Sequence, residues 1–194
     1  MTQIWGEDGV AKVVTVVSAG PITVTQVKTP TKDGYSSVQV GYSQLKEKKV
    51  GKRRQGKPFR HLREVKGPAV GSEEVASGTI FDAGVFAAGD TVRVSGISKG
   101  KGFQGVVKRH GFSGGPRSHG QKHSEREPGA IGGGGGRAGG RVAKGIRMAG
   151  RMGGERVSVR NLKVVGVDEA KQTILLSGAV PGRRGTLLEI VSTD

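Results

Sequence analysis

Sixty central residues, 97–156, contain too much glycine and too much positive charge to form an ordinary packed domain. They hold 19 of the chain's 36 glycines and 13 lysines and arginines against three acids, a net charge of +10 out of +16 for all 194 residues. Ordering a backbone residue costs roughly 1–2 kcal/mol, more for glycine, and few large side chains here could offset that cost by burial. We therefore expect this segment to be largely disordered by itself and to become ordered on a polyanion that neutralises its charges.

Short runs of β-branched or alternating residues flank this segment on both sides and predict a mainly β fold. Residues 12–17 and 22–27 are separated by a Ser-Ala-Gly-Pro turn, which predicts a hairpin. Because no long helical period occurs between the strands, the pattern favours a small antiparallel barrel or sandwich. The other expected strands are residues 35–40, 91–97, 157–167, 173–176 and 186–191.

Residues 43–75 interrupt the β pattern. They carry many lysines and arginines, contain Pro58 and Pro68 and show no sustained period, so we expect an irregular insertion with one or two helical turns at 44–49. The predicted organisation is a first barrel part at 1–42, an irregular basic insertion at 43–84, a continued barrel at 85–98, an extended arm at 99–156 and a last barrel part at 157–194.

Net charge selects the class of partner. A charge of +16 and a sequence pI near 10.6 are typical of a polyanion binder, and nucleic acid is the favoured polyanion. An anionic membrane is the rival, but no run approaches the roughly 18 apolar residues of a spanning helix, so we expect no membrane partner. The absence of cysteine excludes disulfides and thiolate metal sites, and the first residues lack a targeting signal, so the cytosol is expected.

A G-x-G-x-x-G motif occupies residues 100–105 and follows an expected strand, so a dinucleotide or phosphate loop has to be considered. Such a loop needs a following helix, whose N-terminus binds the pyrophosphate. Residues 106–111 are instead β-branched and soon interrupted by glycine, so we expect no helix and assign the glycines to tight turns that lead into the arm. The enzyme alternative would require saturable nucleotide binding at this loop; we expect no cofactor and no small-molecule substrate.

Two histidines and two glutamates form a second candidate site, for metal binding or acid–base chemistry: His119, His123, Glu125 and Glu127. The histidines would share a face only on a helix, and the surrounding glycines and Pro116 argue against one. Imidazoles that donate to phosphates or stack on bases are therefore the favoured interpretation, and no metal site is expected.

No catalytic constellation is found. Ser118 neighbours His119 but has no third partner, and no G-x-S-x-G motif occurs. We expect no catalytic residue. The two glutamates are expected to pair with Arg126 or Lys122, or to be partly solvated.

Side chains suited to RNA recur along the arm. Basic residues from Arg117 to Arg151 are spaced three to eleven apart, which suits an extended ribbon that crosses several phosphates. A solvated flexible linker is the simpler interpretation, but a linker rarely combines such a charge excess with interspersed apolar residues. Of the aromatics, Trp5 is expected in the core and Phe103 on RNA. The expected RNA-binding residues are Lys99, Lys101, Phe103, Lys108, Arg109, Arg117, His119, Lys122, His123, Arg126, Arg137, Arg141, Lys144, Arg147, Arg151 and Arg156.

Several glycine-containing motifs follow one another in a specific order. The first is S-K-G-K-G-F-Q-G-V-V-K-R at residues 98–109, and the others are S-H-G at 118–120, P-G-A-I-G at 128–132, K-G at 144–145, M-A-G at 148–150, M-G-G-E-R-V at 152–157 and G-A-V-P-G at 178–182. Together they closely resemble the family of the third large-subunit ribosomal protein, in its bacterial form. The resemblance covers most of the chain and is weakest at 43–75.

The resemblance implies a six-stranded barrel related to those of translation factors, on the surface of the large subunit, with an arm that reaches through ribosomal RNA toward the peptidyl-transferase region. It also implies early subunit assembly, binding to large-subunit ribosomal RNA and neighbouring ribosomal proteins, and a cytoplasmic location in the ribosome. The protein itself would supply no reacting group. A free-standing nucleic-acid chaperone is the remaining alternative, and it would sediment away from ribosomes.

Two departures from the family pattern stand out. Residues 1–5 resemble the latter part of a longer opening rich in glycine and lysine, so the first strand is expected to be shortened. At residues 132–140 family members often carry a glutamine that is methylated in some bacteria, whereas Gly133 follows Gly132 here, and we do not predict that modification.

Overall fold

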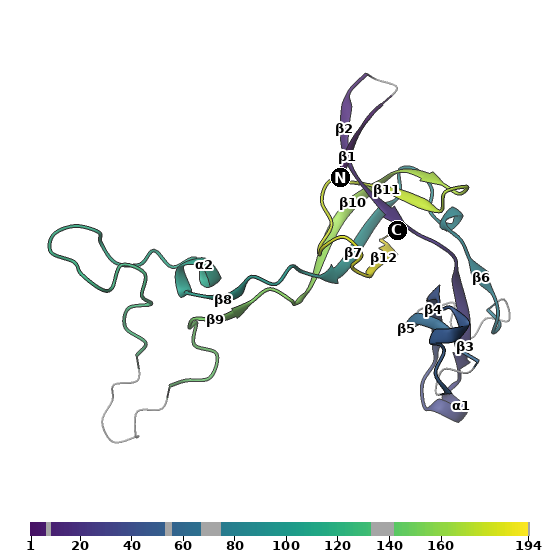
Figure 1. Ribbon diagram of the computed structural model, residues 1–194, viewed down its shortest axis with the longest axis horizontal. Coiled ribbons are helices and arrows are strands. Elements are labelled where there is room, and N and C mark those ends of the chain that lie inside the picture. The colour runs from purple at the N-terminus through teal and green to yellow at the C-terminus, as the bar shows by residue number, and fades with distance from the viewer. Residues whose placement is uncertain (7–8, 53–55, 67–74, 133–141, 194) are drawn as a thin grey trace. The chain divides into compact units, whose positions relative to one another are not determined.

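The computed structural model describes residues 1–6, 9–52, 56–66, 75–132 and 142–193. Its regular structure is mainly β, with antiparallel sheets, as the sequence predicts (Figure 1). The chain forms two compact units. Unit 1 comprises Met1–Arg93, Arg160–Val180 and Ile190–Asp194, and unit 2 comprises Val94–Val159 and Pro181–Glu189.

A six-stranded sheet unites strands from the beginning, middle and end of the chain. Strand β2 pairs antiparallel with β1 and with β11, and β11 pairs antiparallel with β10. The strand order is β1 (Thr2–Trp5), β2 (Ala11–Ser18), β11 (Thr173–Ser177), β10 (Arg156–Asp168), β7 (Thr91–Ile97) and β12 (Leu188–Ser192).

The core of this sheet follows the period of two that the sequence predicts. In β11 the side chains of Ile174 and Leu176 are buried while the residues between and beside them are half-buried. β-Branched residues suit such positions because they pack well on a pleated surface. The buried apolar side chains of the other strands are Val14, Val92, Val94 and Val164.

A four-stranded antiparallel sheet belongs to unit 1. Its order is β5 (Phe59–Val65), β4 (Ser37–Gln44), β3 (Ile22–Lys28) and β6 (Ile80–Phe81). Val24 and Val38 are its buried apolar side chains. Short helices accompany these strands among the described residues: α1 (Pro30–Asp33), η1 (Glu47–Lys49) and η3 (Ala83–Val85).

The strands expected at 12–17 and 22–27 exist, but the predicted hairpin between them is wrong. Strand β2 has both neighbours in the six-stranded sheet, and β3 has both neighbours in the four-stranded sheet, so the two cannot pair. The turn that joins them is bound elsewhere: the amide of Ala19 donates to the carbonyl oxygen of Gln172 at 2.8 Å. The Gly-Pro step therefore leads the chain from one sheet to the other.

The region expected to be an irregular insertion contains regular structure. Strand β5 lies within it and pairs with β4 over Val38↔Val65 to Gln44↔Phe59. Its sequence is F-R-H-L-R-E-V, in which charged residues occupy positions where a period of two would need apolar ones. The sequence pattern therefore did not predict this strand. The helical turn expected at 44–49 is present as η1.

Trp5 is not in the core, contrary to prediction. Its side chain is 74% exposed on β1, the first strand in the order of the six-stranded sheet. Tryptophan is typical of cores because it buries a large area, but a side chain on an outer strand has a neighbour on one side only.

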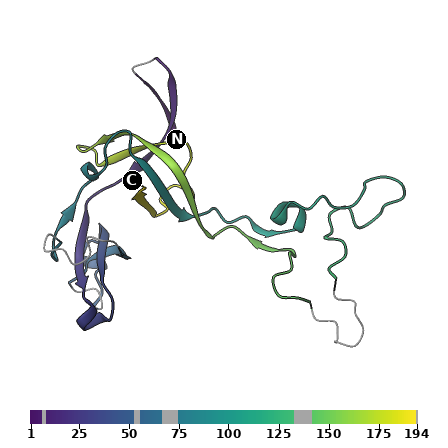
Figure 2. The ribbon, with the colours of Figure 1, turned by 180° about the vertical axis from the view of Figure 1, so that it is seen from behind.

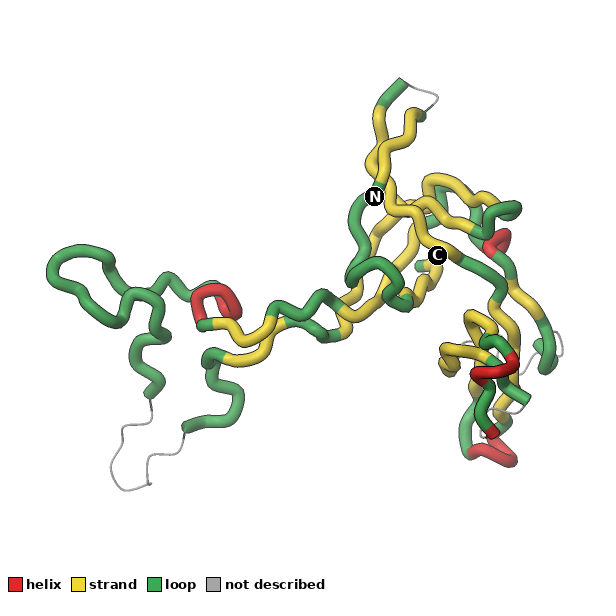
Figure 3. The backbone as a smooth tube through the Cα atoms, in the orientation of Figure 1, coloured by secondary structure: helices red, strands yellow, loops and turns green. Residues whose placement is uncertain are grey.

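Unit 2 contains β8 (Gly102–Gln104), α2 (Val106–His110) and β9 (Gly150–Met152) beside the ends of β7 and β10. Between α2 and β9 the described residues, 111–132 and 142–149, form turns and loops (Figure 3). This is the segment that the sequence predicts to be an extended arm.

Candidate nucleic-acid interface

The arm begins as a stem of two antiparallel segments. The amide of Ser98 donates to the carbonyl oxygen of Glu155 at 2.8 Å, and the amide of Lys101 donates to that of Met152 at 2.9 Å. Strands β8 and β9 continue this ladder, with Phe103 opposite Arg151. Figures 1 and 2 show the two strands side by side from opposite directions. We call residues 98–104 and 150–155 the arm stem.

Glycine makes the stem possible at one position in particular. Gly153 has a φ of +75°, and a Cβ built on it would collide with the carbonyl oxygen of Lys99. Its neighbour Gly154 has a φ of +71° but nothing within 4 Å of such a Cβ. Only Gly153 therefore combines a left-handed backbone with close approach of the facing segment.

A helix does follow the G-x-G-x-x-G motif, which corrects the expectation that none would. Helix α2 spans five residues, begins after Gly105 and ends at His110, and the next residue, Gly111, has a φ of +73°. Val106 is buried and anchors the helix, so tertiary packing outweighs the low helix propensity of valine. Gly102 has a φ of +70°, which favours glycine, but it is the first residue of β8 and does not lie in a turn as expected.

Helix α2 binds the returning segment of the arm just before β9. The Arg109 guanidinium donates through Nη1 to the main-chain oxygen of Met148 at 2.8 Å, and Nε2 of His110 lies 3.1 Å from the same oxygen. A Cβ on Gly150 would meet the Arg109 guanidinium at 2.5 Å. Arg109 is therefore half-buried and holds the arm together, whereas the sequence suggests only contact with RNA.

A loop closes on itself between residues 114 and 125. The amide of Gly115 donates to the carbonyl oxygen of Glu125 at 2.9 Å, and Nε of Arg117 lies 2.5 Å from Oε1 of Glu125. Glu125 thus pairs with Arg117 instead of Arg126 or Lys122, and its side chain is partly solvated, which was the alternative expectation. His119 and His123 lie in turns outside any helix and are exposed. Among the described residues, no three His, Asp or Glu side chains gather in a way that could hold a metal ion.

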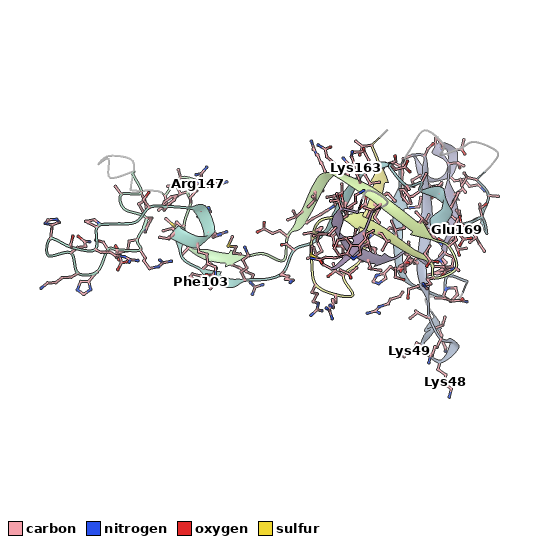
Figure 4. The ribbon with its side chains drawn as sticks, turned by 90° about the horizontal axis from the view of Figure 1, so that it is seen from above. Lys48, Lys49, Phe103, Arg147, Lys163 and Glu169 are labelled. Atoms are coloured by element: carbon pink, nitrogen blue, oxygen red, sulfur yellow. The ribbon has the colours of Figure 1, made fainter. Side chains whose placement is uncertain are left out.

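Most of the predicted RNA-binding side chains are exposed. Arg156 is exposed but pairs with Glu189 at 2.6 Å. Figure 4 shows Phe103 and Arg147 pointing outward from the arm. Arg137 and Arg141 lie outside the described residues. The exposed ones are Lys99, Lys101, Phe103, Lys108, Arg117, His119, Lys122, His123, Arg126, Lys144, Arg147, Arg151 and Arg156.

The arm also has an apolar hollow beside one of these cations. A space of about 240 Å³ is lined mainly by Phe112, Pro128, Ile131 and Ile146, with Arg147 beside them. The sequence shows these apolar residues as interruptions of the charge pattern but does not show that they converge. A flat apolar group, such as a base, next to a phosphate would match this combination of side chains.

Sequence reasoning missed a second group of exposed cations, on β5 and on the turn before it. Lys48, Lys49, Arg60 and Arg63 are all exposed. The sequence feature that could have identified them is the large number of lysines and arginines in residues 43–66. The prediction placed these residues in an irregular basic insertion and gave that insertion no function. No helix in the described part of the chain is long and apolar enough to cross a membrane.

Comparison with known proteins identifies the family. Residues 70–180 match the model of the family described as Ribosomal protein L3. The chain is 48% identical to "Large ribosomal subunit protein uL3" of Desulfitobacterium hafniense, over 97% of this chain and 89% of that protein. It is 47% identical to the uL3 protein of a Picosynechococcus species (100% and 92% covered) and 44% identical to the uL3c protein of Guillardia theta (98% and 94%). The chain therefore belongs to the ribosomal protein L3 family: it is a ribosomal protein of the large subunit, part of the translation machinery, and not an enzyme.

Proposed function

We propose that this chain binds large-subunit ribosomal RNA and that the arm at 99–156 is its principal RNA-binding element. The observation that carries the proposal is the arrangement of the arm, in which exposed cations project from a backbone braced at the stem and at Arg109. Family membership supports it, because the relatives are named as proteins of the large ribosomal subunit.

Binding would rest on phosphates and shape. Lysine and arginine that neutralise phosphates release counterions, a contribution that is independent of base sequence. Phe103, 76% exposed and opposite Arg151, is placed to stack on an unpaired base while the arginine meets a phosphate. Little base-specific readout is needed for this mode of binding.

The finer expectations from the resemblance belong to the same proposal. The six strands of the large sheet would close into a barrel that docks on the subunit surface, and the arm would reach toward the peptidyl-transferase region. Contacts with neighbouring ribosomal proteins, a role in early assembly and a cytoplasmic location in the ribosome complete it. The antiparallel pairing of β1, β2, β11 and β10 is the kind of pairing that such a barrel uses.

Salt dependence of binding tests the electrostatic mechanism. If the chain neutralises six to ten phosphates, its affinity for a large-subunit ribosomal RNA transcript should fall by about 10³–10⁵ between 50 and 200 mM salt, on the scale known for duplex DNA. A shallow dependence would contradict phosphate-dominated binding.

Sedimentation of the endogenous protein tests its place in the cell. At moderate salt the protein should travel with the large subunit of a cell lysate. A protein found in the light fractions, bound equally to many RNAs, would be a free-standing chaperone.

A further inference from the structure

A second concentration of positive charge lies outside the arm. Residues 43–66 contain ten lysines and arginines against two glutamates, a net charge of +8 in 24 residues. Outside this segment and residues 97–156, the remaining 110 residues carry nine lysines and arginines against eleven acids. The excess charge of the chain therefore resides in two segments, and the arm accounts for only one of them.

The second segment is a closed hairpin of the four-stranded sheet. It consists of the end of β4, the turn with η1, and β5, and we call its described residues, 43–52 and 56–66, the basic hairpin. Its base is joined by the amide of Leu45, which donates to the carbonyl oxygen of Pro58 at 2.7 Å, next to the pair Gln44↔Phe59. Nζ of Lys57 donates to Oε1 of Gln39 at 2.6 Å, which ties the base to the sheet.

The cations beyond this base are directed outward. Figure 4 shows Lys48 and Lys49 projecting from the turn, and Arg60 and Arg63 are exposed on β5, the outer strand of the sheet. Among the described side chains, no acid lies within ion-pair distance of these four cations. The paired strands hold these four cations in place, and no described acidic side chain neutralises them.

The one acid of the hairpin whose side chain is described is neutralised on the sheet. Oε1 of Glu64 lies 2.5 Å from Nζ of Lys28, and Oε2 accepts a hydrogen bond from the Tyr35 hydroxyl at 2.9 Å. The hydrogen bond from Lys28 lowers the pKa of Glu64, so this carboxylate stays ionised and paired near neutral pH. Glu64 is thereby occupied with Lys28 instead of with Arg60 or Arg63.

Protection of the sheet edge is a simpler explanation for charges on β5. Charged side chains on an outer strand prevent pairing with other chains. Edge protection explains Arg60 and Arg63, but it gives no role to Lys48 and Lys49, which lie on the turn and not on the strand.

We propose that the basic hairpin is a second RNA-binding surface, which contacts the phosphates of structured RNA independently of the arm. The inference rests on the proposed function, since it takes ribosomal RNA as the ligand. An acidic protein is the other possible partner, but protein interfaces have an apolar centre, and Val65 is the one exposed large apolar side chain among the described residues of the hairpin. A dense cationic surface without such a centre is typical of nucleic-acid interfaces.

The basic hairpin and the arm belong to different units of the chain. The hairpin lies in unit 1, and residues 97–156 lie wholly in unit 2. Each neutralised phosphate adds to the slope of log affinity against log salt, so phosphates contacted by the hairpin should add to those contacted by the arm.

The test compares full-length variants on a large-subunit ribosomal RNA transcript. The hairpin variant carries Lys48→Gln, Lys49→Gln, Arg60→Gln and Arg63→Gln. A charge-matched control carries Lys32→Gln, Lys163→Gln, Arg183→Gln and Arg184→Gln, four cations that are also exposed. Because each phosphate contact contributes about 0.9 to the slope of log affinity against log salt, loss of four contacts should lower the slope of the hairpin variant by about 3.6 and weaken its binding at least tenfold at physiological salt.

Each outcome bears on a different claim. If the wild-type chain itself fails to bind the RNA, the proposed function fails. If the wild type binds and the hairpin variant matches either the wild type or the control in slope, the second surface is refuted while the proposed function stands. Retention of RNA binding with loss of an acidic protein partner would likewise refute it.

Chemical acetylation of lysines in the wild-type chain, with and without the RNA transcript, provides a second measurement. It needs no substituted variant and therefore does not depend on whether a variant folds. Lys48 and Lys49 should become protected on adding the RNA transcript, whereas Lys32 and Lys163 should stay reactive. Equal reactivity of Lys48 and Lys49 with and without RNA would contradict the proposal.

Discussion

The guanidinium of Arg109 donates a hydrogen bond to the main-chain oxygen of Met148 at 2.8 Å, although 39 residues separate the two. This contact joins α2 to the segment that returns to β9. Arg109 thus differs from Arg147, which is exposed, although both are arginines of the same arm.

Substitution of Arg109 and of Arg147 separates a structural role of the arginine from the effect of its charge alone. Arg109→Met removes the hydrogen bond and should destabilise the arm locally by about 1.5–3 kcal/mol, because a charge-assisted bond at a half-buried site is lost. Arg147→Met removes the same charge without that bond. Amide hydrogen exchange in β9 should therefore accelerate in the Arg109 variant only, and equal exchange in the two variants would refute the bracing role.

Phe103 is expected to matter for binding and not for folding. Phe103→Ala should weaken RNA binding by about 1–3 kcal/mol, the range for loss of stacking on one base, without changing the slope against salt. Because the side chain is 76% exposed, thermal stability should barely change. Phe103→Trp serves as the control and should retain affinity. A binding loss accompanied by a lower slope would show that the effect is electrostatic.

Two adjacent glycines give a matched test of the arm stem. Gly153→Ala should disrupt the stem because its Cβ meets the carbonyl oxygen of Lys99, while Gly154→Ala should cost only the roughly 1–2 kcal/mol of a left-handed alanine. Protease sensitivity of the arm, compared between the two variants, measures the difference. Similar sensitivity would mean that backbone conformation alone requires Gly153.

The contact of Lys28 with Glu64 predicts a pH-dependent stability of unit 1. Hydrogen bonding to Glu64 raises the pKa of Lys28, and hydrogen bonding from Lys28 lowers that of Glu64. The stabilisation should be complete between their ordinary values of 4.5 and 10.5, and should be lost as pH falls below or rises above this window. Thermal melts of the wild type and Glu64→Gln should differ near pH 7 and converge in acid. A constant difference across pH would exclude this linkage.

Sequence patterns predicted strands best where burial follows a period of two. The strand expected at 91–97 coincides with β7, because Val92 and Val94 point inward around the exposed Arg93. Strand β5 was missed because its pairing with β4 is a long-range contact that its charged sequence does not show. A period of two in the sequence reveals a strand only when one face of the strand is buried. It does not reveal an edge strand that has exposed residues on both faces.

Partner choice was harder to predict than strand position. Residues 12–17 and 22–27 look like a hairpin because a short turn joins them, yet β2 pairs with β1 and with the distant β11, and β3 pairs with β4 and with β6. The candidate site shows the same limit. Exposure of the arm cations follows from composition, whereas the internal contact of Arg109 with Met148 depends on tertiary structure.

The two antiparallel segments of the arm stem restrict how RNA can come to surround the arm. Because residues 98–104 leave and 150–155 return along one ladder, the arm has no free end. A tail can be drawn through a narrow hole, but a closed loop passes only through an opening wide enough for two chains at once. An RNA that surrounds the arm tightly must therefore finish folding after the protein has arrived, which makes the order of events a consequence of chain topology.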